Sequence, residues 1–319
     1  MSAVLSVNNI RKKYGDIQAV SGVSFAIPEG RIYGLVGADG AGKTTLMRIL
    51  TTLIPPDEGD GTILNHSLLN DTTFIRSAIG YMPQQFSLFG DLSVMENILF
   101  FADVFGVRGK VRNTRISDLL SFSRLSKFTR RPAAKLSGGM KQKLALCCAL
   151  VHTPKVLLLD EPTTGVDPVS RREFWEILHK LRSNGISILV STPYMDEATW
   201  CDELLFLHNG QVLCKGTPEG LLATFPSYVF RVTGAQSDKQ LHCRTDIPLP
   251  EGIERFYPSG GILHVISRDA SLTPEKLFEI IRTIVPEAAH VEKCKPEMED
   301  LFFHLIVTNP SDNHHNKAA

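Results

Sequence analysis

The pattern of apolar and polar positions divides the chain into two regions that meet near residues 225–226. In the first region, continuous apolar runs of strand length alternate with segments of helical apolar spacing. This alternation is typical of a largely parallel sheet covered by helices, because a parallel strand is buried on both faces. The runs predicted to be buried strands are Ile32–Val36, Lys155–Leu159 and Ile186–Ser191. The segments predicted to be helices are Thr45–Leu53, Thr114–Lys127 and Leu144–Val151.

Short β-rich runs occupy the start of the chain. Turns at Tyr14-Gly15-Asp16 and Pro28-Glu29-Gly30 separate these runs, and glycine and proline are the residues that most often mark such breaks. The pattern therefore predicts an antiparallel segment that leads into the strand at Ile32–Val36.

The second region has the pattern of a small, separate α/β unit. Three strands and two helices are predicted there, at Tyr228–Val232, Ile262–Ile266, Pro274–Val285, Ala289–Lys293 and Glu297–Leu305. The polar segment 308–319 is predicted to be a disordered tail, and the pair His314-His315 in it supplies too few ligands for a metal site. We thus expect an α/β domain at 1–225, an accessory α/β domain at 226–307 and the tail.

Composition and charge narrow the class of protein. The 319 residues carry 34 Lys plus Arg and 34 Asp plus Glu, a balance that argues against a nucleic-acid binder and favours a small ligand or a protein partner. The longest apolar stretches are far shorter than the ~18 to 20 residues of a membrane span. The N-terminus lacks an export signal, and the six cysteines lack CxxC spacing. We therefore expect a cytoplasmic protein with reduced thiols, in which the adjacent Cys147 and Cys148 are core residues.

A glycine-rich segment follows the first predicted buried strand. It fits the pattern GxxxxGK[ST] at every defined position and runs directly into the helix predicted from Thr45. Its residues are Gly37, Ala38, Asp39, Gly40, Ala41, Gly42, Lys43 and Thr44, and the following Thr45 is a further candidate nucleotide contact. Such a loop turns backbone N–H groups toward phosphates at a helix N-terminus, while the lysine reaches the β- and γ-phosphates and the threonine hydroxyl binds Mg²⁺. The motif predicts a site for ATP and Mg²⁺.

Two acidic residues end another predicted strand. Asp160 and Glu161 follow Val156–Leu159, which places both at the carboxyl edge of a parallel sheet. There Asp160 is predicted to hold Mg²⁺ through water, and Glu161 is the candidate base for an attacking water.

A third motif lies between these two. The segment Leu136–Lys143 begins Leu-Ser-Gly-Gly-Met, and Ser137, Gly138 and Gly139 would form a second anion site at a helix start. Placed between the phosphate loop and the double acid, this segment resembles the signature of ATP-binding-cassette (ABC) ATPases. The resemblance covers residues 4 to about 225. It implies the P-loop fold of that family, with a parallel sheet, an antiparallel β subdomain and a helical subdomain at about 86–150.

The resemblance also assigns roles to residues outside the motifs. Tyr14 matches the aromatic residue that stacks on adenine, although an ordinary tyrosine at a strand end fits the same position. Gln84 matches the glutamine that senses Mg²⁺ and water and connects to a membrane subunit. Asp167, in Gly165-Val166-Asp167, matches the residue that contacts a second cassette across the dimer interface. The implied partners are a membrane permease and that second cassette, whose ATP the Ser137 loop would grip.

Two positions depart from the family pattern. A histidine that contacts the γ-phosphate is expected after Ile186–Ser191, but Pro193 stands there, with neither a side-chain donor nor an N–H. Asp39 stands where asparagine is more frequent and brings a carboxylate near the phosphates. We expect nucleotide binding to survive both changes and hydrolysis at this chain's own loop to be impaired.

The combination resembles the first cassette of paired or fused ATPases that serve bacterial drug-efflux exporters. Those proteins commonly end in a motif like LEDVF, and Met298–Leu305 is similar, although a generic amphipathic helix fits there equally well. The resemblance implies an ATP-hydrolysing exporter subunit, peripheral on the cytoplasmic face of the inner membrane, with a heterodimer favoured. The alternatives are a non-hydrolysing regulatory cassette that completes a partner's site, and a soluble ABC ATPase without a membrane partner.

The segment from Phe86 to Phe105 is rich in apolar residues. Some of these apolar side chains must be buried in the hydrophobic core. We expect the exposed remainder to form a hydrophobic groove directly after Gln84, suited to a short helix of a membrane partner, with a purely core role as the alternative.

Overall fold

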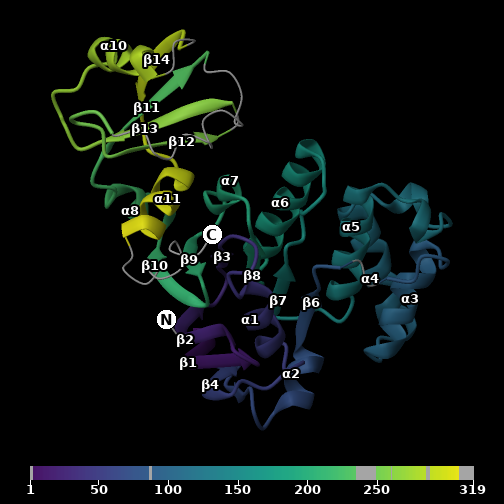
Figure 1. The fold of residues 1–319 in the computed structure, drawn as a ribbon. Helices are drawn as coiled ribbons and strands as arrows, with labels where there is room; N and C mark the ends of the chain where they lie inside the picture. The colour runs from purple at the N-terminus through teal and green to yellow at the C-terminus, as the bar shows by residue number, and fades with distance from the viewer. Residues whose placement is uncertain (1–2, 86–87, 235–248, 260, 285–287, 309–319) are drawn as a thin grey trace. The chain divides into compact units, whose positions relative to one another are not determined.

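The computed structural model describes residues 3–85, 88–234, 249–259, 261–284 and 288–308 (Figure 1). Phe86, the tail after Thr308 and the pair His314-His315 therefore lie outside the described residues. The chain divides into two compact units, Met1–Pro218 and Glu219–Ala319, and the division comes slightly earlier than the expected domain boundary at 225–226. Each unit is described by itself.

A six-stranded sheet forms the centre of the first unit. Its strand order is β10-β9-β3-β8-β7-β6, and every neighbouring pair is parallel except β9 and β10. The strands are β3 (Ile32–Val36), β6 (Ile79–Met82), β7 (Val156–Asp160), β8 (Ser187–Thr192), β9 (Glu203–His208) and β10 (Gln211–Gly216). The three strands predicted from apolar runs are confirmed to within one residue. Every residue of β3, β7 and β8 is buried, as an apolar run with two covered faces requires.

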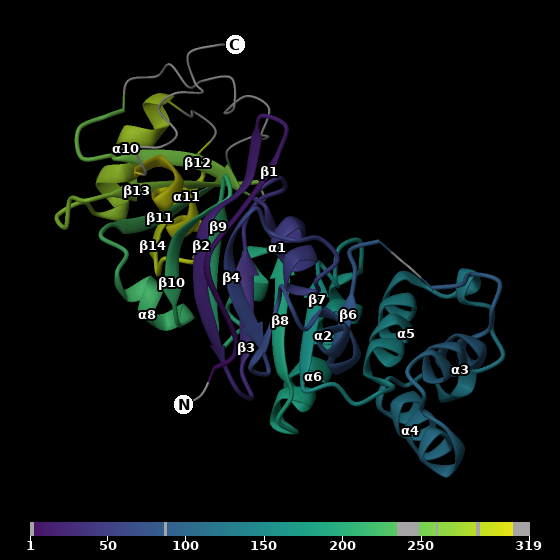
Figure 2. The same cartoon turned by 90° about the horizontal axis from the view of Figure 1, so that it is seen from below.

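An antiparallel sheet packs against this centre. Its strand order is β2-β1-β4-β5, with β1 (Ala3–Tyr14), β2 (Ile17–Pro28), β4 (Glu58–Ile63) and β5 (His66–Ser67). The first helix, α1 (Lys43–Leu50), lies between the two sheets (Figure 2). Leu46 and Met47 of this helix share one hydrophobic core with Leu5 of β1 and Leu158 of β7. The expected antiparallel segment is therefore confirmed.

Further helices cover the central sheet. On the face that carries α1, α2 (Thr72–Ala78) adds Ile75 to the same core. The helices α6 (Pro168–Ser183) and α7 (Met195–Ala198) both pack on β3 and β8. Phe174 and Trp175 of α6 are buried, so the parallel sheet is covered on both faces.

A helical group stands beside β6 (Figure 2). It consists of α3 (Val94–Val104), α4 (Gly109–Phe122), two 3₁₀ turns (Ser126–Phe128 and Ala133–Lys135) and α5 (Gly138–Leu150). The helix predicted at 114–127 ends at Phe122, because Arg124 adopts a left-handed φ of +60° that a helix does not permit. Cys147 and Cys148 are buried in the core of this group, which confirms their predicted role.

The second unit contains four strands where three were expected. Its sheet has the order β12-β13-β11-β14, with β11 (Tyr228–Thr233), β12 (Arg255–Ser259), β13 (Ile262–Ser267) and β14 (His290–Cys294). The missed strand, β12, contains Pro258, which lowers the strand signal and is tolerated because β12 is an edge strand. The helices are α8 (Pro218–Ala223), α10 (Pro274–Ile284) and α11 (Met298–Thr308). In the described part of the chain, no helix is long and apolar enough to cross a bilayer.

Candidate functional site

The phosphate loop connects β3 to α1 at the carboxyl edge of the parallel sheet. A Cβ on Gly37 would come 2.3 Å from the carbonyl oxygen of Leu207, and one on Gly42 would come 2.2 Å from that of Ala19. Gly42 also has a left-handed φ of +102°. It caps α1 without a side-chain hydrogen bond, so the first N–H groups of the helix remain available to an anion. The chain therefore adopts here the backbone that the motif predicts.

Lys43 lies inside this loop. Its ammonium donates to the carbonyl oxygens of Gly37 and Ala38 at 2.9 and 3.0 Å. It also lies 3.0 Å from Oε1 of Glu161, and both side chains are buried. The lysine and the acid of the second motif thus form one charged centre.

Asp160 has the geometry of a metal ligand. Its carboxylate is fully buried, and Oδ1 accepts a hydrogen bond from the Ser191 hydroxyl at 2.7 Å. Oδ2 is buried and has no hydrogen-bond partner among the described residues. Burial raises the pKa of Asp160, while the hydroxyls of Ser191 and Thr44 oppose the shift. An unpaired carboxylate oxygen beside the Thr44 hydroxyl fits Mg²⁺ with its water ligands.

Gln84 reaches the same centre from the neighbouring strand. It follows β6, which pairs with β7, and its amide donates to Oε2 of Glu161 at 2.9 Å. A cavity of about 450 Å³ opens here, and Thr44, Gln84 and Asp160 are among its lining residues. The three predicted metal-site residues and the candidate base are therefore brought together.

Glu161 is held in an unusual backbone conformation. Its φ is +50°, which is rare for a residue with a side chain. Its N–H donates to the carbonyl oxygen and the hydroxyl of Ser191, at 3.2 and 3.0 Å. Ser191 thus fixes both acids, a role that the sequence reasoning missed. The available signal was a hydroxyl residue at the end of a strand that neighbours the acids.

Tyr14, Asp39 and Thr45 are the remaining predicted nucleotide contacts. Tyr14 is exposed at the end of β1, with the Lys12 ammonium 5.9 Å from its ring centroid. Asp39 is exposed on the phosphate loop, and Thr45 lies in the first turn of α1. An exposed ring at Tyr14 is compatible with both interpretations of that residue.

The predicted signature begins α5. Ser137 is its N-cap and accepts a hydrogen bond from the N–H of Met140 at 3.4 Å. Ser137 and Gly138 are exposed, whereas a Cβ on Gly139 would come 2.6 Å from Cβ of Ser170. Across the described ranges, no hydrogen bond or ion pair joins Ser137, Gly138 or Gly139 to the phosphate loop. The signature and the phosphate loop are therefore not joined directly in the described part of the chain.

Asp167 lies close to this signature. It is the exposed N-cap of α6 and accepts a hydrogen bond from the N–H of Ser170 at 2.9 Å. Gly165, two residues earlier, places its carbonyl oxygen 3.5 Å from a Cβ built on Gly138. The loop that carries Asp167 and the start of α5 consequently form one continuous surface.

Pro193 stands directly after β8, next to the phosphate loop. The carbonyl oxygen of the preceding Thr192 accepts a hydrogen bond from the N–H of Gly37 at 3.4 Å. The predicted γ-phosphate contact at this position is thus replaced by a residue that has no donor.

The apolar segment after Gln84 combines core and surface. Ile98 and Ala102 of α3 are fully buried. Leu88, Phe101 and Phe105 line a cavity of about 160 Å³ between the helical group and β6. On the outer side, the exposed residues are Phe89, Phe100 and Val104. The segment therefore combines core residues, residues that line a hollow, and exposed apolar residues that do not line it. The groove stays a prediction.

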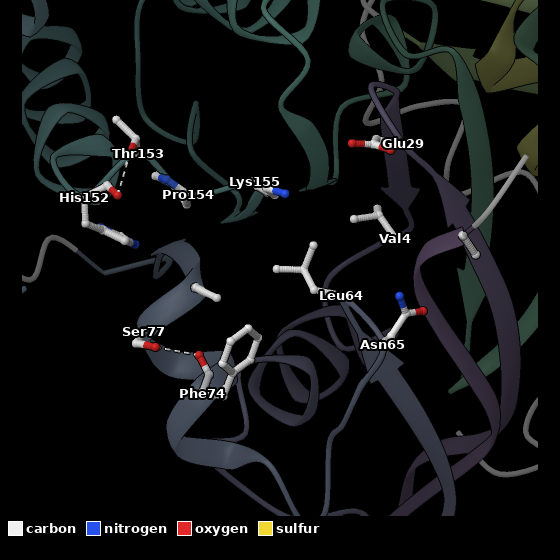
Figure 3. Close-up of a pocket in the computed structure, with 12 residues that line it drawn as sticks. Val4, Glu29, Leu64, Asn65, Phe74, Ser77, His152, Thr153, Pro154 and Lys155 are labelled. Atoms are coloured by element: carbon white, nitrogen blue, oxygen red, sulfur yellow. Dashed lines mark hydrogen bonds between the residues drawn. The ribbon is translucent and has the colours of Figure 1, made fainter.

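A larger cavity lies at the opposite edge of the sheet (Figure 3). It measures about 490 Å³ and opens beside the start of β7. Val4, Leu64, Phe74, His152 and Lys155 are among the residues that surround it. It contains none of the motif residues, so it is separate from the candidate nucleotide site.

The sequence matches of this chain agree with the geometry. Residues 20–164 match the family described as ABC transporter. The probable multidrug ABC transporter ATP-binding protein YbhF of Escherichia coli (strain K12) is 39% identical over 306 residues, covering 95% of this chain and 52% of that protein. The Nod factor export ATP-binding protein I of Ralstonia nicotianae is 34% identical over 310 residues, covering 95% of this chain and 93% of that protein. The chain belongs to the ABC transporter ATPase family. It spans about half the length of YbhF.

Solved ABC structures share the fold. The ATP-binding subunit of an ABC transporter has a TM-score of 0.64 and 29% identity, covering 70% of this chain and 93% of that one. A dimeric ATP-binding cassette in a post-hydrolysis state, bound to ADP and Pi, has a TM-score of 0.61 and 28% identity. The match covers 67% of this chain and 98% of that one. The expected ABC ATPase fold is therefore confirmed.

Proposed function

We propose that this chain is the ATP-binding and ATP-hydrolysing subunit that powers an ABC exporter through nucleotide-driven dimerisation. The observation that carries the proposal is the convergence of Lys43, Asp160, Glu161 and Gln84 beside the phosphate loop. The export direction is supported by the relatives, whose names refer to multidrug transport and to Nod factor export.

The proposal gives each residue of the site a role. The loop N–H groups and Lys43 bind the phosphates, and Tyr14 stacks on the adenine. Thr44, Asp160 and Gln84 would hold Mg²⁺, which neutralises charge on the phosphate oxygens. Glu161 accepts the proton of the attacking water, because its carboxylate lies within hydrogen-bond distance of both Lys43 and the Gln84 amide.

The separation of the signature from the phosphate loop supports a dimer. Among the residues that the structure describes, no hydrogen bond or ion pair joins Ser137, Gly138 or Gly139 to this chain's own phosphate loop. Gly138 and Gly139 lie against the Gly165 loop and α6 instead. A second cassette would therefore supply its Ser137 loop to this chain's nucleotide, and Asp167 would contact that cassette across the dimer interface. Pro193 favours a heterodimer, in which the partner cassette carries the complete hydrolytic site.

The cavity lined by Leu88, Phe101 and Phe105 is the proposed docking groove for a permease. These three residues come from the segment that follows Gln84. Tyr81 and Pro83 line both this cavity and the cavity of about 450 Å³ beside Thr44, Gln84 and Asp160. A short apolar helix of a permease would thus contact the segment that carries the metal-site glutamine. The chain would then lie on the cytoplasmic face of the inner membrane as a peripheral subunit, with no nucleic-acid partner.

Pro193 supports a second candidate function. Removing one preorganised donor from a developing charge costs ~3 to 4 kcal/mol, so the chain's own site would turn over slowly. In that case its Ser137 loop would complete the site of a partner, and this chain would act as a regulatory cassette. The unit from about 226 to 307 would be an accessory domain in either case, with 308–319 as its tail.

Gel filtration with nucleotide tests the proposed function. Glu161→Gln removes the base and keeps the shape, so with MgATP this variant should accumulate as a dimer that ADP does not produce. Adding Ser137→Arg places a bulky charge on the exposed signature and should abolish the dimer while ATP binding persists. A Glu161→Gln chain that remains monomeric with saturating MgATP, alone and when mixed with the partner cassette, would contradict the proposal.

A further inference from the structure

A second buried carboxylate lies behind the site. Glu197 of α7 has no solvent exposure. Its Oε1 accepts a hydrogen bond from the Thr163 hydroxyl at 2.7 Å, and its Oε2 accepts one from the Thr192 hydroxyl at 2.6 Å. Neither the phosphate loop nor the acid motif contains these residues. We call Glu197, Thr163 and Thr192 the Glu197 cluster.

The two threonines belong to the two segments that flank the reacting phosphate. Thr163 comes two residues after the candidate base, Glu161. Thr192 ends β8, and its carbonyl oxygen binds the N–H of Gly37, the first residue of the phosphate loop. The Glu197 cluster therefore connects the base segment, the strand end before Pro193 and the phosphate loop.

The segment around Pro193 is held by further contacts. The N–H of Tyr194 donates to the Thr192 hydroxyl at 3.1 Å. The guanidinium of Arg171 lies 4.1 Å from the centre of the Tyr194 ring. A proline flanked by two anchored neighbours has little freedom, so the backbone here is fixed relative to Glu197.

Among the described residues, Arg171 is the cation that lies close to Glu197. Nε of Arg171, on α6, lies 3.6 Å from its Oε1, while the same guanidinium binds the exposed Asp196 at 3.2 Å. Burial raises the pKa of Glu197, and the two threonine hydroxyls and Arg171 oppose the shift. Replacing a buried ion pair by apolar residues of similar volume often costs no stability, so the two directed hydrogen bonds of Glu197 point to a role in geometry.

We propose that Glu197 is a positioning residue for ATP hydrolysis, which sets the distance between the Glu161 segment and the Thr192–Tyr194 segment. It touches no nucleotide atom and acts through the hydroxyls of Thr163 and Thr192. This inference rests on the proposed function. Glu197 orders the hydrolytic side of the site in a chain whose residue after Thr192, Pro193, has no donor of its own.

Matched threonine variants of the full chain test the inference. Thr163→Val and Thr192→Val keep the shape and remove the hydroxyl, whereas Thr163→Ser and Thr192→Ser keep the hydroxyl. Steady-state phosphate release should show kcat about tenfold lower in each valine variant, the loss of one hydrogen bond to a charged group, with KM for MgATP within about twofold. The serine variants should retain most of kcat.

Glu197→Gln completes the set. It should lower kcat by at least as much as either valine variant, and cooperative thermal unfolding checks that it folds. A merely structural role predicts equal losses for serine and valine, or a rise in KM together with the fall in kcat. Either result, or a normal kcat in the valine variants, would overturn the inference.

A chain without measurable turnover would contradict the hydrolytic part of the proposed function. It would not contradict the positioning role of the Glu197 cluster. The readout is then the ratio of affinities for ATP and ADP, because the cluster orders the side of the site that meets the γ-phosphate. The valine variants should lower that ratio several-fold, and the serine variants should not. An unchanged ratio in all four would dismiss the positioning role.

Discussion

The ammonium nitrogen of Lys43 lies 3.0 Å from Oε1 of Glu161, and less than one twentieth of either side chain is exposed. The cation proposed to bind the phosphates and the candidate base are therefore one buried ion pair. Removing either partner leaves an uncompensated charge in the site, so variants at both positions require a check of folding as well as of activity.

Lys43→Ala should weaken ATP binding about 10- to 100-fold, since a hydrogen bond to a charged group contributes about 1.5–3 kcal/mol. Titration with a fluorescent ATP analogue measures the dissociation constant. The matched control is Lys155→Ala, which removes an exposed cation at the opposite edge of the sheet. Equal affinities in the wild-type chain and Lys43→Ala would refute the phosphate-loop assignment.

The chain alone should bind MgATP and hydrolyse it slowly, and Pro193→His should raise turnover by up to about 100-fold. The φ that proline adopts, near −65°, is open to histidine, so the exchange need not strain the end of β8. Phosphate release is measured at concentrations high enough for dimerisation. Fast turnover by the unmodified chain would show that the site is not impaired.

Asp39→Asn separates two explanations if Pro193→His remains slow. Asp39 is exposed on the phosphate loop, and its charge repels phosphate oxygens. A gain on adding Asp39→Asn to Pro193→His would identify this repulsion as the limiting factor. No gain would leave the missing partner cassette as the cause, and mixing with that cassette would then restore the rate.

A chain that ends at Pro218 should bind ATP as tightly as the full chain, because all of the matched nucleotide motifs lie in the first unit. Circular dichroism and cooperative unfolding confirm that the shortened chain folds. A folded chain that has lost ATP affinity would show that the second unit contributes to the site.

Asp300→Asn should destabilise the second unit by about 2 kcal/mol, because Asp300 is buried and accepts hydrogen bonds from Tyr257 and the N–H of Glu297. Its Oδ1 also lies 3.0 Å from Nδ1 of His264. Thermal unfolding of both proteins at pH 7 measures the difference. An unchanged midpoint would show that these contacts carry no stability.

The pH dependence of that difference has a definite sign. Burial works to raise the pKa of Asp300, but hydrogen bonds from His264, Tyr257 and Glu297 outweigh it and hold the pKa below its ordinary 3.8. The stabilisation is therefore fully present above pH 3.8 and is lost as the pH falls through the lower native pKa. The gap between the wild-type and Asp300→Asn midpoints should therefore close in strong acid.

The sequence by itself determined the features that depend on residues close together in the chain. The phosphate loop needs glycine at Gly37 and Gly42, and the motif shows this directly. The apolar runs of β3, β7 and β8 predict buried strands, because only a strand with both faces covered has no polar side. The edge strand β12 has no continuous apolar run of this kind, because Pro258 interrupts its sequence.

Only the tertiary structure decided which distant residues meet. The order β3-β8-β7-β6 brings the ends of these strands to one edge of the sheet, and so joins Lys43 and Gln84 to Glu161. The buried Glu197 lies in a four-residue helix without any motif, and its role depends on Thr163 and Thr192, which come from separate segments. Hydrogen bonds of this kind depend on strand order and burial, which local residue patterns do not encode.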